Sequence, residues 1–374
     1  MTTPRRAPEV LLRRYWDDPD TPVVTAGLSA LSVGYRGALR VRDLAYRWRL
    51  LRTGRLPATV VSVGNLTLGG SGKTPTVELV VRTLQELGAQ PAVVSRGYGR
   101  SSRGVRVVAD REAVRAAARV SGDEPLLLAE RLPGVPVVVG ENRHEAGRVA
   151  VEQLAATALV LDDGFQHRTL AKDLEIVVVQ GREPWGNARV FPRGMLREPL
   201  SALRRAHLVL VTNPPEPSRV EAVTETVRRY NPRAPVLSAR YALESAIETR
   251  ASRRVPIAEL AGRRLLAFAG LGSPQGFADT LDAIGIRRVG FVELPDHHWF
   301  TARDVEELTR DARASGAQGL VTTEKDWVRI RALAPPTLPL WVLPVRLALD
   351  SGREVWQQAL AAALASEPLG RPLS

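Results

Sequence analysis

Cysteine is absent from the 374 residues of the chain. This absence excludes a disulfide scaffold, a zinc site built on thiolates and a cysteine nucleophile, and it agrees with a reducing compartment. Aromatic residues are also scarce, at 5% of the chain. A platform of aromatic side chains that stacks nucleic-acid bases is therefore not indicated.

A secretory signal is missing as well. The first residues, Met1 to Tyr15, carry arginines, but no apolar run with a small-residue cleavage site follows them. We therefore expect a cytoplasmic protein.

The rest of the composition is typical of a folded protein, with 44% hydrophobic and 25% charged residues. A length of 374 residues exceeds the usual size of one hydrophobic core and favours two α/β domains. The net charge of +12 predicts an acidic partner, which is nucleic acid, anionic lipid or a phosphorylated substrate. Arginine bias in a high-GC genome is an alternative source of part of this charge.

The stretch from Thr21 to Pro57 interleaves apolar residues with arginines, and Asp43 is its only acid. Its longest uncharged run, Thr21 to Tyr35, is shorter than the roughly 20 residues needed to span a bilayer. One interpretation is an amphipathic helix that lies in the membrane interface with its arginines toward anionic lipid. The other is a helix packed on its own domain with a solvated basic face.

Short β-branched runs alternate with helical spacing through the middle of the chain, which predicts a mostly parallel sheet flanked by helices. A second β-α series begins only at Arg264 to Ala269, where Gly270, Gly272 and Gly276 predict a tight strand-to-helix turn and not a dinucleotide fingerprint. We therefore expect an N-terminal basic segment at 1–57, a larger domain at 58–245 and a smaller α/β domain at 246–374. The predicted strands are Ala58 to Val63, Pro91 to Ser95, Val135 to Val139, Ala158 to Leu161, Glu175 to Val179, His207 to Val211, Arg264 to Ala269 and Gly319 to Thr323.

The strongest local signal is a glycine-rich loop between a strand and a helix. Glycines let successive backbone N–H groups turn toward phosphate oxygens, Lys73 supplies a charge to the β- and γ-phosphates, and Thr74 offers a hydroxyl to Mg²⁺. Thr67 stands where the strict motif has glycine, but the remaining glycines still free the backbone. The predicted nucleotide-binding residues are Thr67, Leu68, Gly69, Gly70, Ser71, Gly72, Lys73 and Thr74.

Two adjacent acids, Asp162 and Asp163, directly follow the apolar strand Ala158 to Leu161. A carboxylate at the carboxyl end of a parallel strand points toward the nucleotide crevice and can hold Mg²⁺ or its waters. Beside the P-loop this pair predicts a metal site, although such pairs are also common in turns. The sequence does not say which of the two touches the metal.

Two further clusters are not diagnostic by themselves. Within Ser121 to Pro125, Gly122-Asp123 alone favours a turn with a helix cap, and within Pro295 to Trp299, His297 or His298 alone favours a satisfied surface histidine.

Taken together, these segments resemble the tetraacyldisaccharide 4'-kinase family. The resemblance runs from about Tyr15 to Ile330, and residues 1–14 form an extension of open role. It rests on Gly64 to Pro75, Ser95 to Gly99, Gly122 to Pro125, Asp162 to His167 and Asp296-His297, which follow one another in the family's order.

The resemblance implies ATP- and Mg²⁺-dependent phosphorylation of the 4'-hydroxyl of a tetraacyldisaccharide 1-phosphate. It places this reaction on the cytoplasmic side of the inner membrane, on a peripheral protein that needs neither nucleic acid nor an obligate protein partner. It implies that Asp123 is the base, paired with His297 of the second domain, and that the domains close around ATP. It also implies metal contacts at Thr74, Asp162, Asp163 and Glu124, and acceptor contacts at Arg96, Tyr98, Gln166 and His167.

Two other functions compete with this interpretation. A switch-type NTPase shares a similar loop, but it needs no Asp296-His297 segment and its turnover responds to a protein. A non-enzymatic nucleic-acid binder agrees with the charge, but it requires aromatics among its basic residues, whereas the arginines here gather ahead of the first strand.

Overall fold

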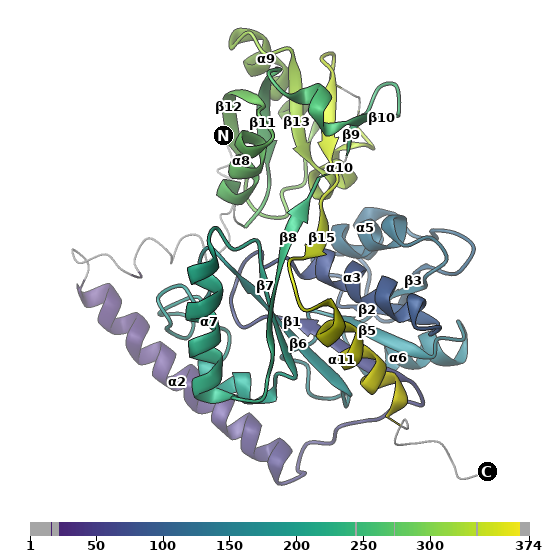
Figure 1. Cartoon of the computed structure of the whole chain (residues 1–374), viewed down its shortest axis with the longest axis vertical. Helices are drawn as coiled ribbons and strands as arrows, with labels where there is room; N and C mark the ends of the chain where they lie inside the picture. Colours follow the sequence, from purple (N-terminus) through teal and green to yellow (C-terminus); the bar gives the residue numbers. More distant parts are fainter. Residues whose placement is uncertain (1–15, 17–21, 244, 273, 334–335, 367–374) are drawn as a thin grey trace.

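A computed structural model describes Trp16 and residues 22–243, 245–272, 274–333 and 336–366. The extension at 1–14 lies outside the described residues. The described chain forms two α/β domains of unequal size, which confirms the predicted fold class (Figure 1).

The larger domain contains a sheet of nine strands in the order β15-β8-β7-β6-β1-β5-β2-β4-β3. Neighbours from β8 to β4 pair in parallel, and only the two outermost strands are antiparallel to their neighbours. The strands are β1 (Thr59–Gly64), β2 (Pro91–Ser95), β3 (Arg106–Ala109), β4 (Val137–Val139), β5 (Ala158–Asp162), β6 (Leu174–Gln180), β7 (Leu208–Thr212), β8 (Val236–Ala242) and β15 (Arg346–Leu349).

Helices cover both surfaces of this sheet, because its buried strands are apolar on both sides. Their bounds are α2 (Pro22–Arg47), α3 (Lys73–Glu86), α4 (Ala118–Ser121), α5 (Asp123–Arg131), α6 (Arg143–Glu152), the 3-10 helix η1 (Leu200–Arg205), α7 (Pro217–Tyr230) and α11 (Arg353–Ala365). Residues of α3, α5 and α11 share one core cluster, and those of α6 and α7 belong to clusters on the other side.

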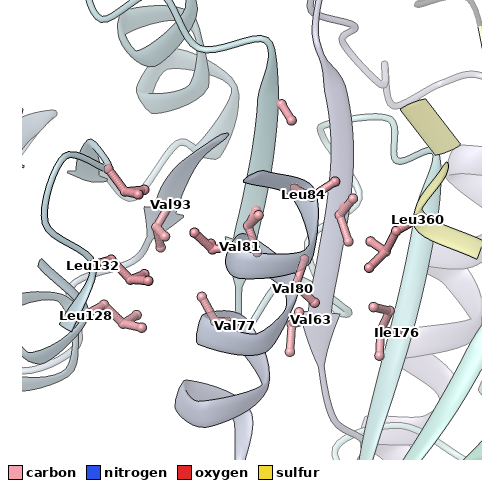
Figure 2. Close-up of a cluster of buried hydrophobic side chains, with 14 of the residues drawn as sticks. Val63, Val77, Val80, Val81, Leu84, Val93, Leu128, Leu132, Ile176 and Leu360 are labelled. Atoms are coloured by element: carbon pink, nitrogen blue, oxygen red, sulfur yellow. The ribbon is translucent and has the colours of Figure 1, made fainter. Parts of the chain in front are cut away.

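The helix that follows the P-loop shows how the sequence produces this packing. Val77, Val80, Val81 and Leu84 of α3 recur at helical spacing and are fully buried against strand residues such as Val63 (Figure 2). The first turn of α3 is thereby held at the carboxyl end of β1, where a nucleotide site is expected.

The smaller domain has a six-stranded sheet in the order β10-β9-β14-β13-β11-β12. Side chains of α8 join the core on one side of this sheet, and those of α9 and α10 join it on the other. The elements are β9 (Ser245–Glu248), β10 (Arg253–Pro256), the 3-10 helix η2 (Ile257–Leu260), β11 (Arg264–Ala269), α8 (Pro274–Ala283), β12 (Arg287–Glu293), α9 (Ala302–Ala314), β13 (Gly319–Thr323), α10 (Glu324–Ile330) and β14 (Leu340–Leu343).

The predicted smaller domain of 246–374 extends too far toward the C-terminus. The predicted start lies within one residue of β9. However, β15 pairs antiparallel with β8, and Trp356 and Leu360 of α11 are buried in the core of the larger domain, so β15 and α11 belong to that larger domain. The smaller domain is thus inserted between β8 and β15, which lie side by side where the chain crosses between the domains (Figure 1).

Helix α2 runs along the outside of the larger domain, at the lower left of Figure 1. Leu28, Ser32 and Leu39 are buried, and the Ser32 hydroxyl donates to the carbonyl of Val190 at 2.8 Å. One stripe of the helix therefore packs on the domain. Several further large apolar side chains of α2 are exposed, namely Val23, Val24, Leu31, Val33, Tyr35, Val41 and Leu44. None of the helices in the described ranges is both long and apolar enough to cross a membrane.

Candidate active site

The predicted P-loop connects β1 to α3 and contains Thr67 to Gly72, with Lys73 and Thr74 in the first turn of the helix. Gly69 and Gly72 have positive φ angles of 91° and 83°, which glycine adopts without the steric penalty of a Cβ. A side chain at Gly72 would also lie 2.9 Å from the hydroxyl of Tyr241. The Thr212 hydroxyl donates to the carbonyl of Ser71 at 2.9 Å, so neighbouring strands hold the loop in place.

Lys73 lies over the loop with a mostly buried ammonium group. Its Nζ donates to Oδ1 of Asn65 at 3.3 Å and lies 3.7 Å from Oδ1 of Asp163. The hydroxyl of Ser71 is buried without a hydrogen-bond partner among the described residues. A charged donor and an unpartnered hydroxyl beside a glycine loop suit a phosphate group.

Asp162 and Asp163 lie in different surroundings although they are adjacent. Asp162 ends β5 and is 2% exposed; its Oδ2 accepts from the Ser95 hydroxyl at 3.0 Å, and its Oδ1 has no partner among the described residues. Asp163, with a φ of 52°, receives two hydrogen bonds from Arg197 at 3.0 and 2.8 Å.

The pKa values of the two carboxyl groups move in opposite directions. Burial, with the nearby charges of Glu124 and Asp163, raises the pKa of Asp162 to about 7. Desolvation also acts to raise the pKa of Asp163, but the charges of Lys73 and Arg197 outweigh it and lower the value to about 2. The free, buried oxygen of Asp162 therefore lacks the positive partner that Asp163 already has.

That oxygen is where the structure fits a divalent cation. Within the described residues no three acidic or histidine side chains gather into a metal site. Mg²⁺ does not require such a cage beside a nucleotide, because it takes only one or two carboxylates and completes its shell with waters and phosphate oxygens. The unpartnered oxygen of Asp162, a residue close enough to Lys73 of the P-loop for the lysine charge to influence its pKa, matches that need.

Asp123 and His297 come together from the two domains, as predicted. Nδ1 of His297 lies 3.0 and 3.2 Å from the carboxylate oxygens of Asp123, which is 3% exposed. Burial acts to raise the pKa of Asp123, but the hydrogen bond with His297 and the charges of Lys325 and Arg329 lower it to about 2. The pair is therefore held with the carboxylate ionised.

Lys325 of α10 connects the Asp123–His297 pair to the rest of the site. Its Nζ lies 3.0 Å from Oε1 of Glu124 and 3.2 Å from Oδ1 of Asp296. Desolvation acts to lower the pKa of Lys325, but the charges of Glu124, Asp296 and Asp123 raise it above its usual range. Glu124, a predicted metal contact, thus lies in an ion pair across the domain boundary.

The predicted acceptor residues fall into two groups. The ring of Tyr98 lies 5.2 Å from that of His297, and Arg96 and Tyr98 line one cavity. Gln166 instead donates to the backbone carbonyl of Asn65 at 2.9 Å. His167 lies 2.6 Å from the hydroxyl of Thr169, and burial, followed by the charge of Arg143, lowers its pKa to about 4.

Sequence reasoning missed several charged residues of the site. Arg197 donates a hydrogen bond to Asp163. Arg143 is buried, which lowers its pKa, and it lies close enough to Asp162 and Asp163 for their charges to influence that pKa. Arg329 is fully buried, with its Nε 3.6 Å from Oδ2 of Asp123. None of these arginines stands in a recognisable motif, and only the fold brings them to the carboxylates. Their common signal is a buried guanidinium nitrogen without an acceptor among the described residues.

Known proteins with similar sequences and structures agree with one another. The family described as Tetraacyldisaccharide-1-P 4'-kinase matches residues 24–365. A Tetraacyldisaccharide 4'-kinase of Anaeromyxobacter sp. (strain K) is 44% identical over 342 residues, covering 90% of each chain. One of Syntrophus aciditrophicus (strain SB) is 38% identical over 348 residues, covering 90% of this chain and 93% of that protein.

Among solved structures, LpxK from Aquifex aeolicus in complex with ATP is similar, with a TM-score of 0.71 and 29% sequence identity. The match covers 91% of this chain and 99% of that one.

Proposed function

Since the chain belongs to the tetraacyldisaccharide 4'-kinase family, we propose which of its residues perform each part of that family's reaction. The reaction is the ATP-dependent phosphorylation of the 4'-hydroxyl of a tetraacyldisaccharide 1-phosphate in lipid A biosynthesis. The observation that carries the residue assignments is a continuous series of contacts between the P-loop and the Asp123–His297 pair. Gly272 lies against Gly70, and Asp296 and Lys325 continue the series to Glu124.

The P-loop binds the phosphates of ATP. Its backbone N–H groups and the ammonium of Lys73 lie along the β- and γ-phosphates, where they stabilise the charge of the transferred group. Thr74 and Asp162 hold Mg²⁺, with Asp163 and Glu124 beside them, and the bound ion would neutralise charge on the β- and γ-phosphates. Arg197 and Arg143 add positive charge at the same place.

Asp123 accepts the proton of the 4'-hydroxyl. A carboxylate with a pKa of about 2 is a weak base, but transfer of a phosphoryl group through a loose transition state depends mainly on positioning and charge. His297 orients the carboxylate and shares the proton as the new bond forms. Arg96, Tyr98, Gln166 and His167 are the candidate contacts of the acceptor.

Transfer of ³²P from ATP to tetraacyldisaccharide 1-phosphate tests these assignments. We expect Asp123→Asn to lower the rate at least about 100-fold, the lower end of what a positioned general base contributes, and Lys73→Ala to lower it comparably. Asp110→Asn is the matched control, because Asp110 lies on a turn and pairs with Arg115. Absence of lipid product with the unaltered enzyme would contradict the function, whereas full activity of Asp123→Asn would remove only the base assignment.

Helix α2 supports a second part of the proposal, a peripheral position on the cytoplasmic side of the inner membrane. Leu31, Val33 and Val41 are 64%, 67% and 68% exposed, although burial of such side chains is normally favourable. The exposed cations Arg36 and Arg40 lie on the same helix. An apolar surface with interspersed arginines suits the headgroup layer of an anionic membrane, and it would bring the enzyme to an acylated substrate.

Co-sedimentation with vesicles containing anionic phospholipid tests this position. We expect a Leu31→Ser, Val33→Ser, Val41→Ser variant to lose most of its vesicle binding and to retain its fold. Val355→Ser is a control, because Val355 is an exposed apolar residue on α11, away from α2. Equal sedimentation of the triple variant and the unaltered enzyme would reject the membrane role of α2.

A further inference from the structure

A cavity of about 450 Å³ lies beside Tyr98, in the loop that follows β2. Three arginines line it, Arg96, Arg100 and Arg103, against one acid, Glu141. Neither the nucleotide nor the transfer of the phosphoryl group, as described above, uses Arg100 or Arg103. Two of the three arginines of the cavity therefore have no assigned ligand.

Arg100 is the buried member of this group. Its side chain is 3% exposed; Nη2 donates to Oε1 of Glu141 at 2.6 Å and to the carbonyl of Gly104 at 2.7 Å. Its Nη1 is buried and has no acceptor among the described residues. A buried guanidinium N–H without an acceptor is unfavourable, so this nitrogen points to a ligand that supplies one.

The other two arginines are exposed and form no hydrogen bond or ion pair with any described residue. Burial lowers the pKa of Arg143, and the charges of Asp162, Arg96 and Arg100 also influence it. Arg143 therefore lies near both Asp162 and the arginines of the cavity. The positive region therefore extends from the edge of the metal site to Arg103. Three guanidinium groups beside a single acid leave an excess of positive charge that suits phosphate oxygens, which a planar guanidinium can bind through two parallel hydrogen bonds.

The cavity is firmly connected to the catalytic pair. The Ser101 amide donates to the carbonyl of Arg119 at 2.8 Å, and the Ser102 hydroxyl donates to that of Val120 at 2.6 Å. A side chain at Gly122 would lie 2.9 Å from the carbonyl oxygen of Tyr98. The loop that lines the cavity is thus bonded to the segment that ends at Asp123, and a ligand there shares one rigid unit with the base.

We propose that this cavity binds the 1-phosphate of the acceptor, the phosphate monoester at the opposite end of the disaccharide from the reacting 4'-hydroxyl. The inference rests on the proposed function, which supplies an acceptor with one hydroxyl to phosphorylate and one phosphate already present. A phosphate held by Arg100 and Arg103 would fix the direction in which the disaccharide enters, so that the 4'-hydroxyl reaches Asp123.

Steady-state kinetics with two acceptors in detergent micelles test the inference, one with the 1-phosphate and one without it. We expect the unaltered enzyme to have a KM at least about tenfold lower for the phosphorylated acceptor, as a charge-assisted hydrogen bond to phosphate implies. This ratio should fall toward one in Arg100→Gln and in Arg103→Gln. Arg106→Gln is the matched control, an exposed arginine on the neighbouring strand β3 that does not line the cavity, and it should keep the ratio.

Three results would overturn the inference while leaving the proposed function intact. They are equal KM values of the unaltered enzyme for the two acceptors, an equal rise of both KM values in the variants, and a rise confined to the KM for ATP. Arg103 is exposed, so its variant should fold even if Arg100→Gln does not. Failure of the unaltered enzyme to phosphorylate either acceptor would instead overturn the proposed function, and this inference with it.

Discussion

At the scale of single residues, the site depends on different surroundings for chemically identical groups. Asp162 and Asp163 are neighbours, yet one oxygen of Asp162 is buried without a partner while Arg197 occupies both oxygens of Asp163. A bound cation would satisfy the first carboxylate, whereas a guanidinium already satisfies the second. The structure therefore favours Asp162 as the direct ligand of Mg²⁺ and Asp163 as the residue that holds Arg197 in place.

This difference predicts the effect of removing each charge. Removal of a residue that merely orients a metal ligand weakens metal binding about 10- to 100-fold. Removal of a direct ligand should cost at least as much, so Asp162→Asn should raise the Mg²⁺ concentration for half-maximal activity at least about tenfold. Asp163→Asn should change that concentration less, because it removes mainly the ion pair with Arg197. Titration of kinase activity with Mg²⁺ at saturating ATP measures both values, and the opposite ranking would contradict the assignment.

At the scale of elements, the buried carboxylate of Glu198 attaches α2 to the rest of the larger domain. Glu198 is 2% exposed and accepts from Arg42 of α2 and from Arg205 of η1, both at 2.7 Å. Burial acts to raise the pKa of Glu198, but the charge of Arg205 and the hydrogen bond with Arg42 outweigh it and lower the pKa. This ion-pair network anchors the basic helix whose apolar side chains remain exposed.

The direction of the Glu198 pKa shift determines how its contribution to stability depends on pH. A carboxyl group with a lowered pKa in the folded state stabilises that state above its unfolded pKa of about 4.3, and the contribution is lost as pH falls through the folded value. Glu198→Gln should therefore lower the free energy of unfolding at pH 7 by about 3 kcal/mol, the lower end of the range for breaking a buried ion pair. The difference from the unaltered protein should shrink below about pH 4.

Denaturant unfolding at pH 7 and at pH 3.5 measures this loss. Glu112→Gln is the matched control, since Glu112 is 85% exposed in its pair with Arg115 and should change little at either pH. A difference between Glu198→Gln and the unaltered protein that stays constant with pH would show that the carboxylate charge does not anchor α2.

Elements were predictable where their signal lies in contiguous residues. The predicted strands Pro91 to Ser95 and Arg264 to Ala269 agree with β2 and β11 at both ends, and the other predicted strands agree within two residues at each end. Strand β15 was not predictable in its place, because four residues carry no information about a partner far back in the chain. Its Arg346 pairs with Ala242, and the whole smaller domain lies between these two residues in the chain.

At the scale of the whole molecule, the site is complete only where the two domains meet. Val328 of α10 packs with Leu126 and Leu127 of α5 at this boundary, and Arg331 lies 2.8 Å from Glu130. Asp123 and His297 are 174 positions apart, so no local pattern could pair them, and only the family resemblance brought them together beforehand. The arginines around them were not predictable, because charge alone does not reveal which cations the fold will bury.

Gly272 of the smaller domain lies against Gly70 of the P-loop, so a substitution at this glycine can test closure itself. A Cβ at Gly272 would lie 3.1 Å from the amide nitrogen of Gly70 and 3.0 Å from Oδ2 of Asp296. Gly272→Ala should therefore keep the smaller domain slightly away from the loop and displace His297 from Asp123. Since displacement of a catalytic group by about 1 Å can lower the rate as much as 100-fold, we expect kcat/KM to fall about 10- to 100-fold.

Gly276→Ala is the matched control for this closure test, because a Cβ at Gly276 in α8 meets nothing within 4 Å. That change should leave kcat/KM unaltered and stabilise the helix slightly, by about 0.5 to 1 kcal/mol. Thermal unfolding separates the two effects: Gly272→Ala should lose activity with little change in melting temperature, since the added methyl group lies between the domains and outside either core. If instead both variants keep the kinetic constants of the unaltered enzyme, the contact of Gly272 with the P-loop is not part of the catalytically competent arrangement of the domains.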